Sequence, residues 1–323
     1  MSTFNGSSYI REQVSSIQKQ TLDTWELLIR DDGSSDNTVE IIQEYIDTDK
    51  RISLVSEKQA NLGAMKSFNA LINIASERNA DYLMFCDQDD FWEPWKIEKT
   101  LQLMLYTEKI NPPGTPILAH TDLFVVDSDL KQISASYLRH QRMHNAENRD
   151  LQTLLSQNYV TGCTIMINKD LLTIAQPIPD VAIMHDWWYS LCASVTGKIA
   201  FLDTPTIKYR QHSTNVYGSS GFFNMLFSGK RLHTYLSRKR SNYLNSYSQD
   251  LALRERLAGT KYCNTRKFDI LNKYCSIGKK PVILRLFIAI RLGIHQQGIL
   301  RNFFFFYSLI FIEPDKMDSN LSD

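Results

Sequence analysis

The N-terminal half of the chain alternates short apolar runs with amphipathic segments, and this alternation constrains the fold more than any other feature. Apolar runs of strand length occupy residues 25–30, 52–55 and 82–86. Between them, residues 39–46 and 65–78 carry apolar side chains three and four positions apart, the spacing of an amphipathic helix. Strands that alternate with helices form a parallel sheet covered on both faces. We therefore predict an α/β fold with a mostly parallel sheet.

Composition excludes several other classes of protein. Of the 323 residues, 43% are hydrophobic, which is too many for a disordered chain. The five cysteines are widely spaced and include no CxxC pair, so neither a disulfide framework nor a zinc site is favoured. No charge-free apolar run reaches about 18 residues, and no secretory signal opens the chain. We expect a cytoplasmic location.

Charge divides the chain into two regions. Residues 1–215 carry 19 basic and 28 acidic side chains, whereas residues 216–323 carry 17 basic and 7 acidic ones. An acidic region suits a bound cation. A basic region suits nucleic acid, an anionic lipid leaflet, or simply a solvated helical tail. The sequence thus predicts two regions with different partners, of which the second is basic, aromatic and helical.

Acidic clusters follow two of the predicted strands, at residues 31–32 and 87–90. In open α/β sheets, ligands bind beyond the carboxyl ends of the strands. Carboxylates that repel one another there are stabilised by Mg²⁺ or Mn²⁺, which also takes phosphate oxygens. A diphosphate bound through the metal becomes a better leaving group. The alternatives are a solvated loop at residues 87–90 and a plain turn with a helix cap at residues 31–36.

Taken together, these segments resemble the family 2 glycosyltransferases, which have the GT-A fold. The resemblance covers about residues 1–215, in the family's order and spacing, and implies that this region is the catalytic domain. It lies in residues 2–6, 20–21, 25–38, 61–63, 87–92, 161–164, 185–188 and 209–212. The segments DQDDFW and HDWW are similar to the rhamnosyltransferase-like branch that builds bacterial surface polysaccharides.

The resemblance implies a nucleotide-sugar donor and assigns it a set of residues. Thr3, Phe4 and Asn5 match the stretch that approaches the nucleotide base. Asp32 matches the acid that contacts the base; by its chemistry alone, this carboxylate could accept from a base imide or from ribose. Asp87 matches the acid near the ribose and diphosphate.

Other matching residues imply a metal and a catalytic base. Asp89 matches the metal-binding acid of the DxD motif, so Mg²⁺ or Mn²⁺ is the implied cofactor. His212 matches a group near the diphosphate or metal, and Arg210 lies beside it toward the donor. Asp186 matches the base that takes a proton from the acceptor hydroxyl. Attack opposite the nucleotide would then invert the sugar carbon through an oxocarbenium-like transition state. The alternative for Asp186 is a helix N-cap.

The residues around Asp186 carry further expectations. We expect His185 to support the site through hydrogen bonds rather than as a metal ligand. Trp187 and Trp188 are candidates for a platform on which a sugar stacks, and we expect at least one of them to be core.

The sequence departs from the family pattern at two places. Relatives have a short apolar strand before the segment that matches residues 2–5, and Met1 takes the place of its last residue. That strand is normally central, so we expect its neighbours to be exposed and the stability to be poor if the chain starts here. Gln88 interrupts the acidic run, which this branch tolerates.

The C-terminal region carries apolar runs broken by arginine over residues 279–312. These runs are too short to span a bilayer but suit a helix that lies in the interface. The basic clusters at residues 229–231 and 238–240 would add attraction to anionic lipid. We expect peripheral contact with the inner face of the cell membrane, where a lipid-linked acceptor would be reached. The alternative is a helical subdomain that packs residues 303–306 inward.

Two other classes of function remain for comparison. A Mg²⁺-dependent nucleotidyltransferase or phosphohydrolase also needs acidic strand ends, but the expected glycine-rich basic phosphate loop is missing near the N-terminus. A nucleic-acid-binding protein is disfavoured by the acidic N-terminal region. The branch resemblance favours dTDP-L-rhamnose as donor, and leaves UDP-glucose, UDP-galactose and UDP-N-acetylhexosamine open. The acceptor would be a growing cell-surface polysaccharide or a lipid-linked oligosaccharide.

Overall fold

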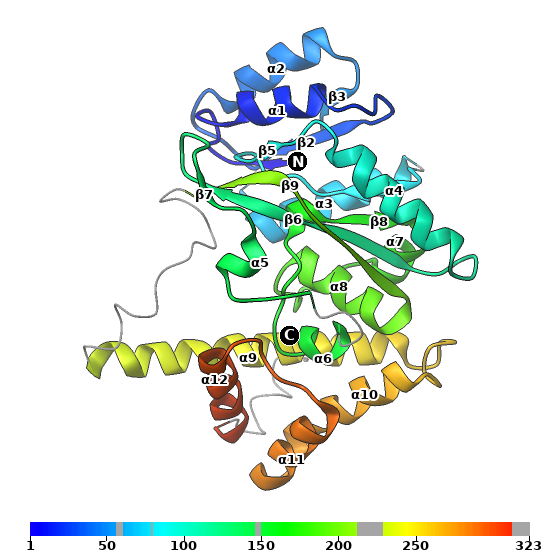
Figure 1. Ribbon diagram of the computed structural model, residues 1–323, viewed down its shortest axis with the longest axis vertical. Helices are drawn as coiled ribbons and strands as arrows, with labels where there is room; N and C mark the ends of the chain where they lie inside the picture. Colours follow the sequence, from blue (N-terminus) through cyan, green and yellow to red (C-terminus); the bar gives the residue numbers. More distant parts are fainter. Residues whose placement is uncertain (56–60, 79, 146–149, 212–228, 312–323) are drawn as a thin grey trace.

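The computed structural model describes residues 1–55, 61–78, 80–145, 150–211 and 229–311, with side chains from residue 236 onward in the last range. Its elements form an α/β region above a group of C-terminal helices (Figure 1). The expected α/β class is confirmed.

The first sheet is small and fully parallel. Strand β1 (Ser2–Thr3) pairs with β2 (Leu27–Asp31), which pairs with β3 (Ile52–Leu54). Helices α1 (Ile10–Gln18) and α2 (Thr38–Thr48) lie on one face, and α3 (Ala64–Glu77) contacts β1 and β2 from the other (Figure 1). The apolar stripe of α1 packs into the core beside this sheet, because Ile10, Val14 and Ile17 are almost fully buried.

The second sheet mixes parallel and antiparallel pairs in the order β4-β8-β6-β9-β5, with β7 beside β6. Only β6 and β9 pair in parallel. Its strands are β4 (Tyr82–Met84), β5 (Phe91–Trp92), β6 (Ile117–Val126), β7 (Gln132–Ser134), β8 (Met166–Asn168) and β9 (Lys198–Arg210). β6 is one continuous strand of ten residues, whose pairing with β9 shifts register near Asp122.

Helices cover both faces of this sheet. Helix α4 (Lys96–Lys109) packs on β6 and β9. On the other side lie α7 (Lys169–Ala175) and α8 (His185–Thr196), beside the short helices α5 (Tyr137–His140) and α6 (Asp150–Leu154). Helix α8 is buried along nearly its whole length, so it anchors whatever its first turn carries.

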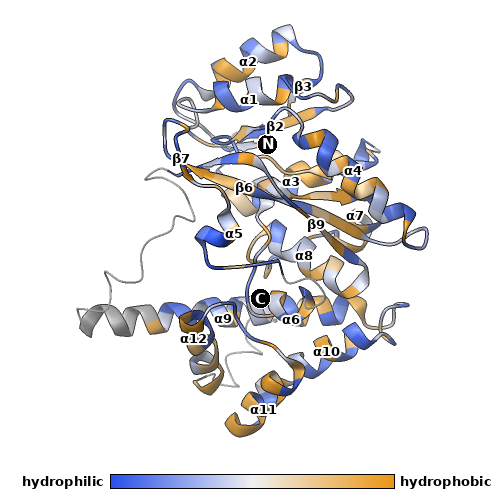
Figure 2. Cartoon of the chain, in the orientation of Figure 1, coloured by the Kyte–Doolittle hydropathy of each residue, from blue (hydrophilic) through white to orange (hydrophobic). Residues whose placement is uncertain are grey.

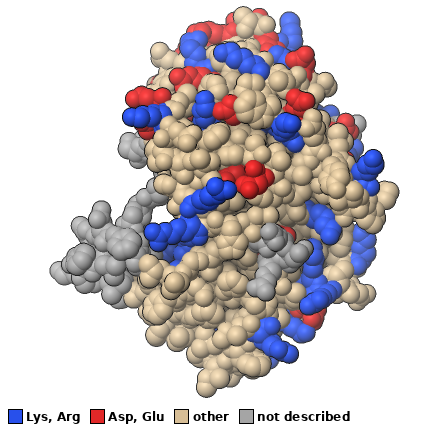
Figure 3. All heavy atoms as spheres, in the orientation of Figure 1, with Lys and Arg blue, Asp and Glu red and all other residues tan. Residues whose placement is uncertain are grey.

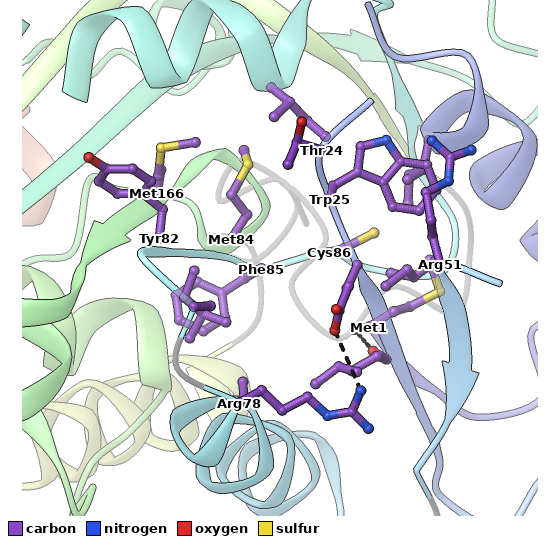
Figure 4. Close-up of a pocket in the computed structure, with 18 of the residues that line it drawn as sticks. Met1, Thr24, Trp25, Arg51, Arg78, Tyr82, Met84, Phe85, Cys86 and Met166 are labelled. Atoms are coloured by element: carbon purple, nitrogen blue, oxygen red, sulfur yellow. Dashed lines mark hydrogen bonds and ion pairs between the residues drawn. The ribbon is translucent and has the colours of Figure 1, made fainter. Parts of the chain in front are cut away.

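A cavity of about 620 Å³ separates the two sheets between β2 and β4. Figure 4 shows Met1 and Trp25 on one side of it, and Met84 and Phe85 on the other. The Met1 ammonium lies inside and donates to the Leu28 carbonyl at 2.7 Å, and burial lowers its pKa.

The C-terminal helices are α9 (Gly229–Leu257), α10 (Arg266–Cys275), α11 (Val282–Leu292) and α12 (Ile299–Ile310). They share one hydrophobic core with the α/β region, because Tyr243, Leu271 and Phe305 belong to the same cluster as Trp188. The predicted boundary between residues 215 and 216 lies outside the described residues. None of the helices in the described part of the chain is long and apolar enough to cross a membrane.

Candidate active site

The end of β2 is organised by Asp31. Its carboxylate accepts from the Thr3 hydroxyl at 2.9 Å and from the Ser34 amide at 2.8 Å. Gly33 has a φ of +89°, which a residue with a side chain rarely adopts, so the turn after β2 depends on this glycine. Thr3 is 1% exposed, so its side chain binds this turn rather than open solvent.

Asp32 is buried and holds a second turn. It forms an ion pair with Arg30 at 2.5 Å and accepts from the amides of Leu62 and Gly63, each at 2.8 Å. The segment at residues 61–63 that the resemblance singled out is therefore fixed against the end of β2. The predicted contact of Asp32 with a base stays a prediction.

Phe4 and Asn5 reach the surface beside the turn that follows β2. Phe4 is 45% exposed, and Asn5 has a φ of +48° and accepts from the Ser35 amide at 2.8 Å. Their exposure next to the two strand ends is compatible with the predicted approach to a nucleotide base.

Gln88 joins the two sheets across the site. Its amide accepts from the Phe4 N–H at 2.9 Å and donates to the Phe4 carbonyl at 3.0 Å. A Cβ on Gly6 would lie 2.2 Å from the Gln88 side-chain oxygen, so a larger residue there would displace the Gln88 amide. The sequence showed Gln88 only as a break in an acidic run, because its partner lies 84 residues away.

The acidic loop after β4 gathers charge at the same edge. Ligand atoms of Asp87, Asp90 and Cys163 lie within 4.8 Å of one another. Burial, followed by the charges of Asp89 and Asp186, raises the pKa of Asp87 to about 7. Burial raises the pKa of Asp90 well above its ordinary value, with the Asp87 and Asp89 charges adding to it. Carboxylates that repel one another in this way are stabilised by a divalent cation.

A buried cation lies below this loop. Lys96 is fully buried at the start of α4, and its ammonium sits 4.6 Å from the centre of the Trp92 ring. Burial lowers its pKa to about 8, although the charge of Asp90 opposes that shift. The Lys96 ammonium partly offsets the negative charge of Asp90, the inner carboxylate of the loop. Asp87 and Asp89 are the outer, more accessible pair.

Asp186 stands in the first turn of α8. Met184 is the N-cap residue of this helix, so the N-cap alternative for Asp186 is wrong. The carboxylate accepts from the Trp187 amide at 2.6 Å and from the Gly162 amide and the Asn158 side chain. Burial nevertheless raises its pKa to about 6. The charge of Asp186 contributes to the raised pKa of Asp87, which places the two groups near each other.

His185, which precedes Asp186, does not have the role expected of it. The His185 ring stacks on Phe68 and Phe85, with centroids 4.2 and 4.6 Å away, and neither ring nitrogen has a hydrogen-bond partner among the described residues. The prediction that His185 supports the site through hydrogen bonds is therefore wrong. Burial lowers its pKa to about 3, so the ring is neutral.

The two tryptophans separate into different roles. Trp188 is 0% exposed and donates to the Ala175 carbonyl at 2.8 Å, which corrects the platform prediction for this residue: no sugar can reach its faces. Trp187 is half-buried and donates to the Leu154 carbonyl at 2.7 Å. A sugar platform at Trp187 stays a prediction.

Arg210 is buried at the end of β9 and binds protein groups. Its guanidinium donates to the Asp89 carbonyl at 2.9 Å, to the Ser128 carbonyl and to the Glu12 carboxylate. It therefore ties the acidic loop to a turn of the second sheet and to α1. The contact with the donor that was predicted for Arg210 stays a prediction, and the described geometry favours a positioning role. His212, predicted near the metal, lies outside the described residues.

These elements bring two acidic strand ends and a half-buried carboxylate on a buried helix to one edge of an α/β fold. The fold is shared with two solved structures that hold a nucleotide sugar. S. aureus TarS 1–349 in complex with UDP-GlcNAc matches with a TM-score of 0.54 at 13% identity, over 90% of this chain and 77% of that one. The mannosyltransferase PcManGT of Pyrobaculum calidifontis, in complex with GDP-Man and Mn²⁺, matches with a TM-score of 0.53 at 14% identity, over 90% and 72%.

The sequence family agrees with the fold. The family described as Glycosyl transferase family 2 matches residues 1–172, and the chain belongs to it. The dTDP-rhamnosyl transferase RfbG of Shigella flexneri is 28% identical over 72% of this chain and 78% of its own length. The UDP-Glc:alpha-D-GlcNAc-diphosphoundecaprenol beta-1,3-glucosyltransferase WfgD of Escherichia coli is 38% identical over 32% of this chain and 39% of its own.

Proposed function

We propose that the chain is an inverting, metal-dependent glycosyltransferase that moves rhamnose from dTDP-L-rhamnose to a hydroxyl of a growing cell-surface polysaccharide. The observation that carries the activity is that Asp186 binds the Gly162 amide, next in the chain to Cys163, whose sulfur lies within 4.8 Å of carboxylate oxygens of Asp87 and Asp90. The similarity to RfbG supports rhamnose. The similarity to WfgD supports the second candidate, a UDP-hexose or UDP-N-acetylhexosamine donor on the same fold.

Asp186 is the proposed base. The acceptor hydroxyl is a poor nucleophile until a group takes its proton, and Asp186 is mostly ionised at neutral pH because its pKa is about 6. Its hydrogen bonds with the Trp187 and Gly162 amides hold the carboxylate in one orientation on a buried helix. Attack opposite the departing nucleotide would invert the sugar carbon in one step.

The outer carboxylates fit a hard divalent cation. Asp87 and Asp89 offer oxygen ligands, and the repulsion that raises the pKa of Asp87 would be relieved by positive charge. The Cys163 thiol fits less well, because burial raises its pKa well above the ordinary value and it stays protonated. Mg²⁺ or Mn²⁺, when bound, would offset the charge on the leaving diphosphate.

The acceptor is proposed to be a lipid-linked oligosaccharide, reached from the inner face of the cell membrane. Support comes from the basic C-terminal region and from the named acceptor of WfgD, a diphosphoundecaprenol-linked sugar. The family match argues against a nucleotidyltransferase.

Donor binding tests the proposal. The melting temperature is measured with dTDP, UDP and GDP, each with and without Mn²⁺, because a ligand that binds only the folded state raises it. We expect the largest rise with dTDP plus Mn²⁺, by about 2–8 °C at ligand concentrations near 100 Kd. In Asp89→Asn the increment due to Mn²⁺ should disappear. A UDP preference would keep the enzyme class and change the sugar, whereas no response to any nucleotide would overturn the proposal.

A further inference from the structure

Exposed apolar side chains are concentrated on the last two helices. Of the 17 large hydrophobic residues exposed in the described part of the chain, ten lie between residues 282 and 311. Ile283 is 84% exposed, Phe287 61% and Ile299 91%. Figure 2 shows both helices largely in the hydrophobic colour, at the end of the molecule away from β2 and β3. Single exposed apolar residues are normal, but a contiguous group marks an interaction site.

The exposed residues form one face on each helix. Ile283, Phe287 and Ile290 follow at spacings of four and three on α11, and Ile299 and Phe303 follow at a spacing of four on α12. These five residues are named the α11–α12 face. The opposite sides are packed, because Ala289, Phe305 and Leu309 belong to the hydrophobic core. The helices are therefore anchored by their packed sides, and the α11–α12 face is left exposed among the residues that the structure describes.

The charged residues within the segment that forms the α11–α12 face are of one sign. Residues 279–312 contain five basic and no acidic residues. Lys279, Lys280 and Arg291 are exposed. In Figure 3, the acidic side chains gather over the upper part of the face shown, and the lower part carries mainly basic and uncharged ones. An apolar stripe with a basic border fits the boundary between anionic headgroups and acyl chains.

Two other occupants fit less well. Neither helix can cross a bilayer, since α11 has 11 residues and α12 has 12. A second copy that used the same face would bring Lys279, Lys280 and Arg291 toward their own copies, since a twofold interface joins identical patches. The like charges would oppose that association.

We infer that the α11–α12 face is a docking surface for an anionic lipid bilayer, with both helices lying in the plane of the interface. The inference rests on the proposed function for its purpose, because it would bring the enzyme to a lipid-linked acceptor. It goes further in naming the residues that enter the lipid.

Vesicle flotation of the full chain tests the inference without any sugar donor. The vesicles contain phosphatidylcholine alone or phosphatidylcholine with phosphatidylglycerol. We expect flotation with the anionic vesicles and a loss of at least about tenfold in partitioning for Ile283→Ser/Phe287→Ser/Phe303→Ser. The matched control is Leu105→Ser/Tyr106→Ser/Ile110→Ser, which removes exposed apolar side chains from α4 and should float like the wild type.

Two further measurements test the role of the basic residues and the possibility of self-association. Lys279→Gln/Lys280→Gln/Arg291→Gln should weaken binding to anionic vesicles and leave binding to neutral ones unchanged. Wild-type protein that stays unbound with anionic vesicles overturns the inference, as does equal loss in the α4 control. A dimer in solution that the α11–α12 variant dissociates, without vesicle binding, would assign the face to a second copy. The thermal shift with nucleotide, measured on the same variants, keeps this result separate from the proposed function.

Discussion

At the scale of single residues, the site depends on carboxylates that share one edge but differ in surroundings. Asp186 is half-buried, receives directed hydrogen bonds and has a pKa of about 6. Asp87 has a pKa of about 7, because two other carboxylates add to its burial. The first environment suits a base and the second suits a metal ligand, so similar side chains can take different roles.

Asp186→Asn should keep the shape of the first turn of α8 and lose the proton acceptor. We expect kcat to fall by about 10²–10⁴-fold while the donor-induced thermal shift stays unchanged. Asp170→Asn, an exposed acid on α7, is the matched control and should keep its rate. A variant at position 186 that retains most of its rate would show that the base lies elsewhere.

The wild-type rate should depend on pH in one direction. Because the base must be ionised, the rate should rise as pH passes through about 6 and then level off. The residual rate of Asp186→Asn should lack that rise. The pH–rate profile is measured at saturating metal, so that the titration of Asp87 is suppressed. A rise that persists in the asparagine variant would belong to another group.

At the scale of elements, Arg210 and Gln88 join loops from both sheets into one site. Arg210 comes from the end of β9 and reaches the loop after β4, the turn after β6, and α1. Gln88 reaches back to the backbone just after β1. Neither contact is local, so the acidic loop keeps its position only when the strands of both sheets are assembled.

Arg210→Met tests the positioning role at this scale. Loss of its buried hydrogen bonds should lower the free energy of unfolding by about 3 kcal/mol and weaken donor binding as a consequence. Arg210→Lys keeps the charge but not the fork of donors, and should recover only part of the stability. Arg11→Met, which breaks an exposed ion pair with Glu44, should leave the free energy of unfolding nearly unchanged. Wild-type stability with lost nucleotide binding would instead indicate direct contact of Arg210 with the donor.

At the scale of the whole molecule, the cavity between β2 and β4 separates two sheets that otherwise face each other. The edges of both strands line it together with apolar side chains from α3. The Met1 ammonium is buried there, and an ionised group in such a place costs free energy. The region is therefore expected to limit the stability of the chain as described.

A short apolar extension joined ahead of Met1 should raise the melting temperature. A few apolar residues in extended form would bury further apolar area beside β2 and would convert the buried ammonium into an amide. An extension of the same length made of glycine and serine is the control and should give a smaller rise. No difference between the two extensions would show that apolar burial in the cavity contributes little.

The same extension predicts a change in the pH dependence of stability. Burial lowers the pKa of the Met1 ammonium from 8.0, so the unfolded chain binds the proton more tightly. Stability should therefore rise with pH up to about 8 in the unextended chain, and this component should vanish in both extended ones. Urea unfolding at several pH values measures it.

Local sequence determined much of this protein. Apolar runs and helical spacing placed β2, β3, β4 and most helices of the N-terminal region, because each depends on residues close in the chain. The acidic pairs at residues 31–32 and 87–90 showed where a site would form, since parallel strands end at a common edge. The ordered motifs indicated the family that the sequence comparison confirmed.

Only the tertiary structure decided the rest, because it depends on partners far apart in the sequence. The antiparallel pairs of the second sheet and the single long strand β6 follow from cross-strand contacts that local periodicity does not encode. Trp187 and Trp188 are neighbours in the chain, yet the turn of α8 makes one half-buried and the other fully buried. Gln88 and Arg210 acquire their roles from partners 84 and 121 residues away. Residue type and spacing determine which chemistry is present, and packing determines which of those groups a ligand can reach.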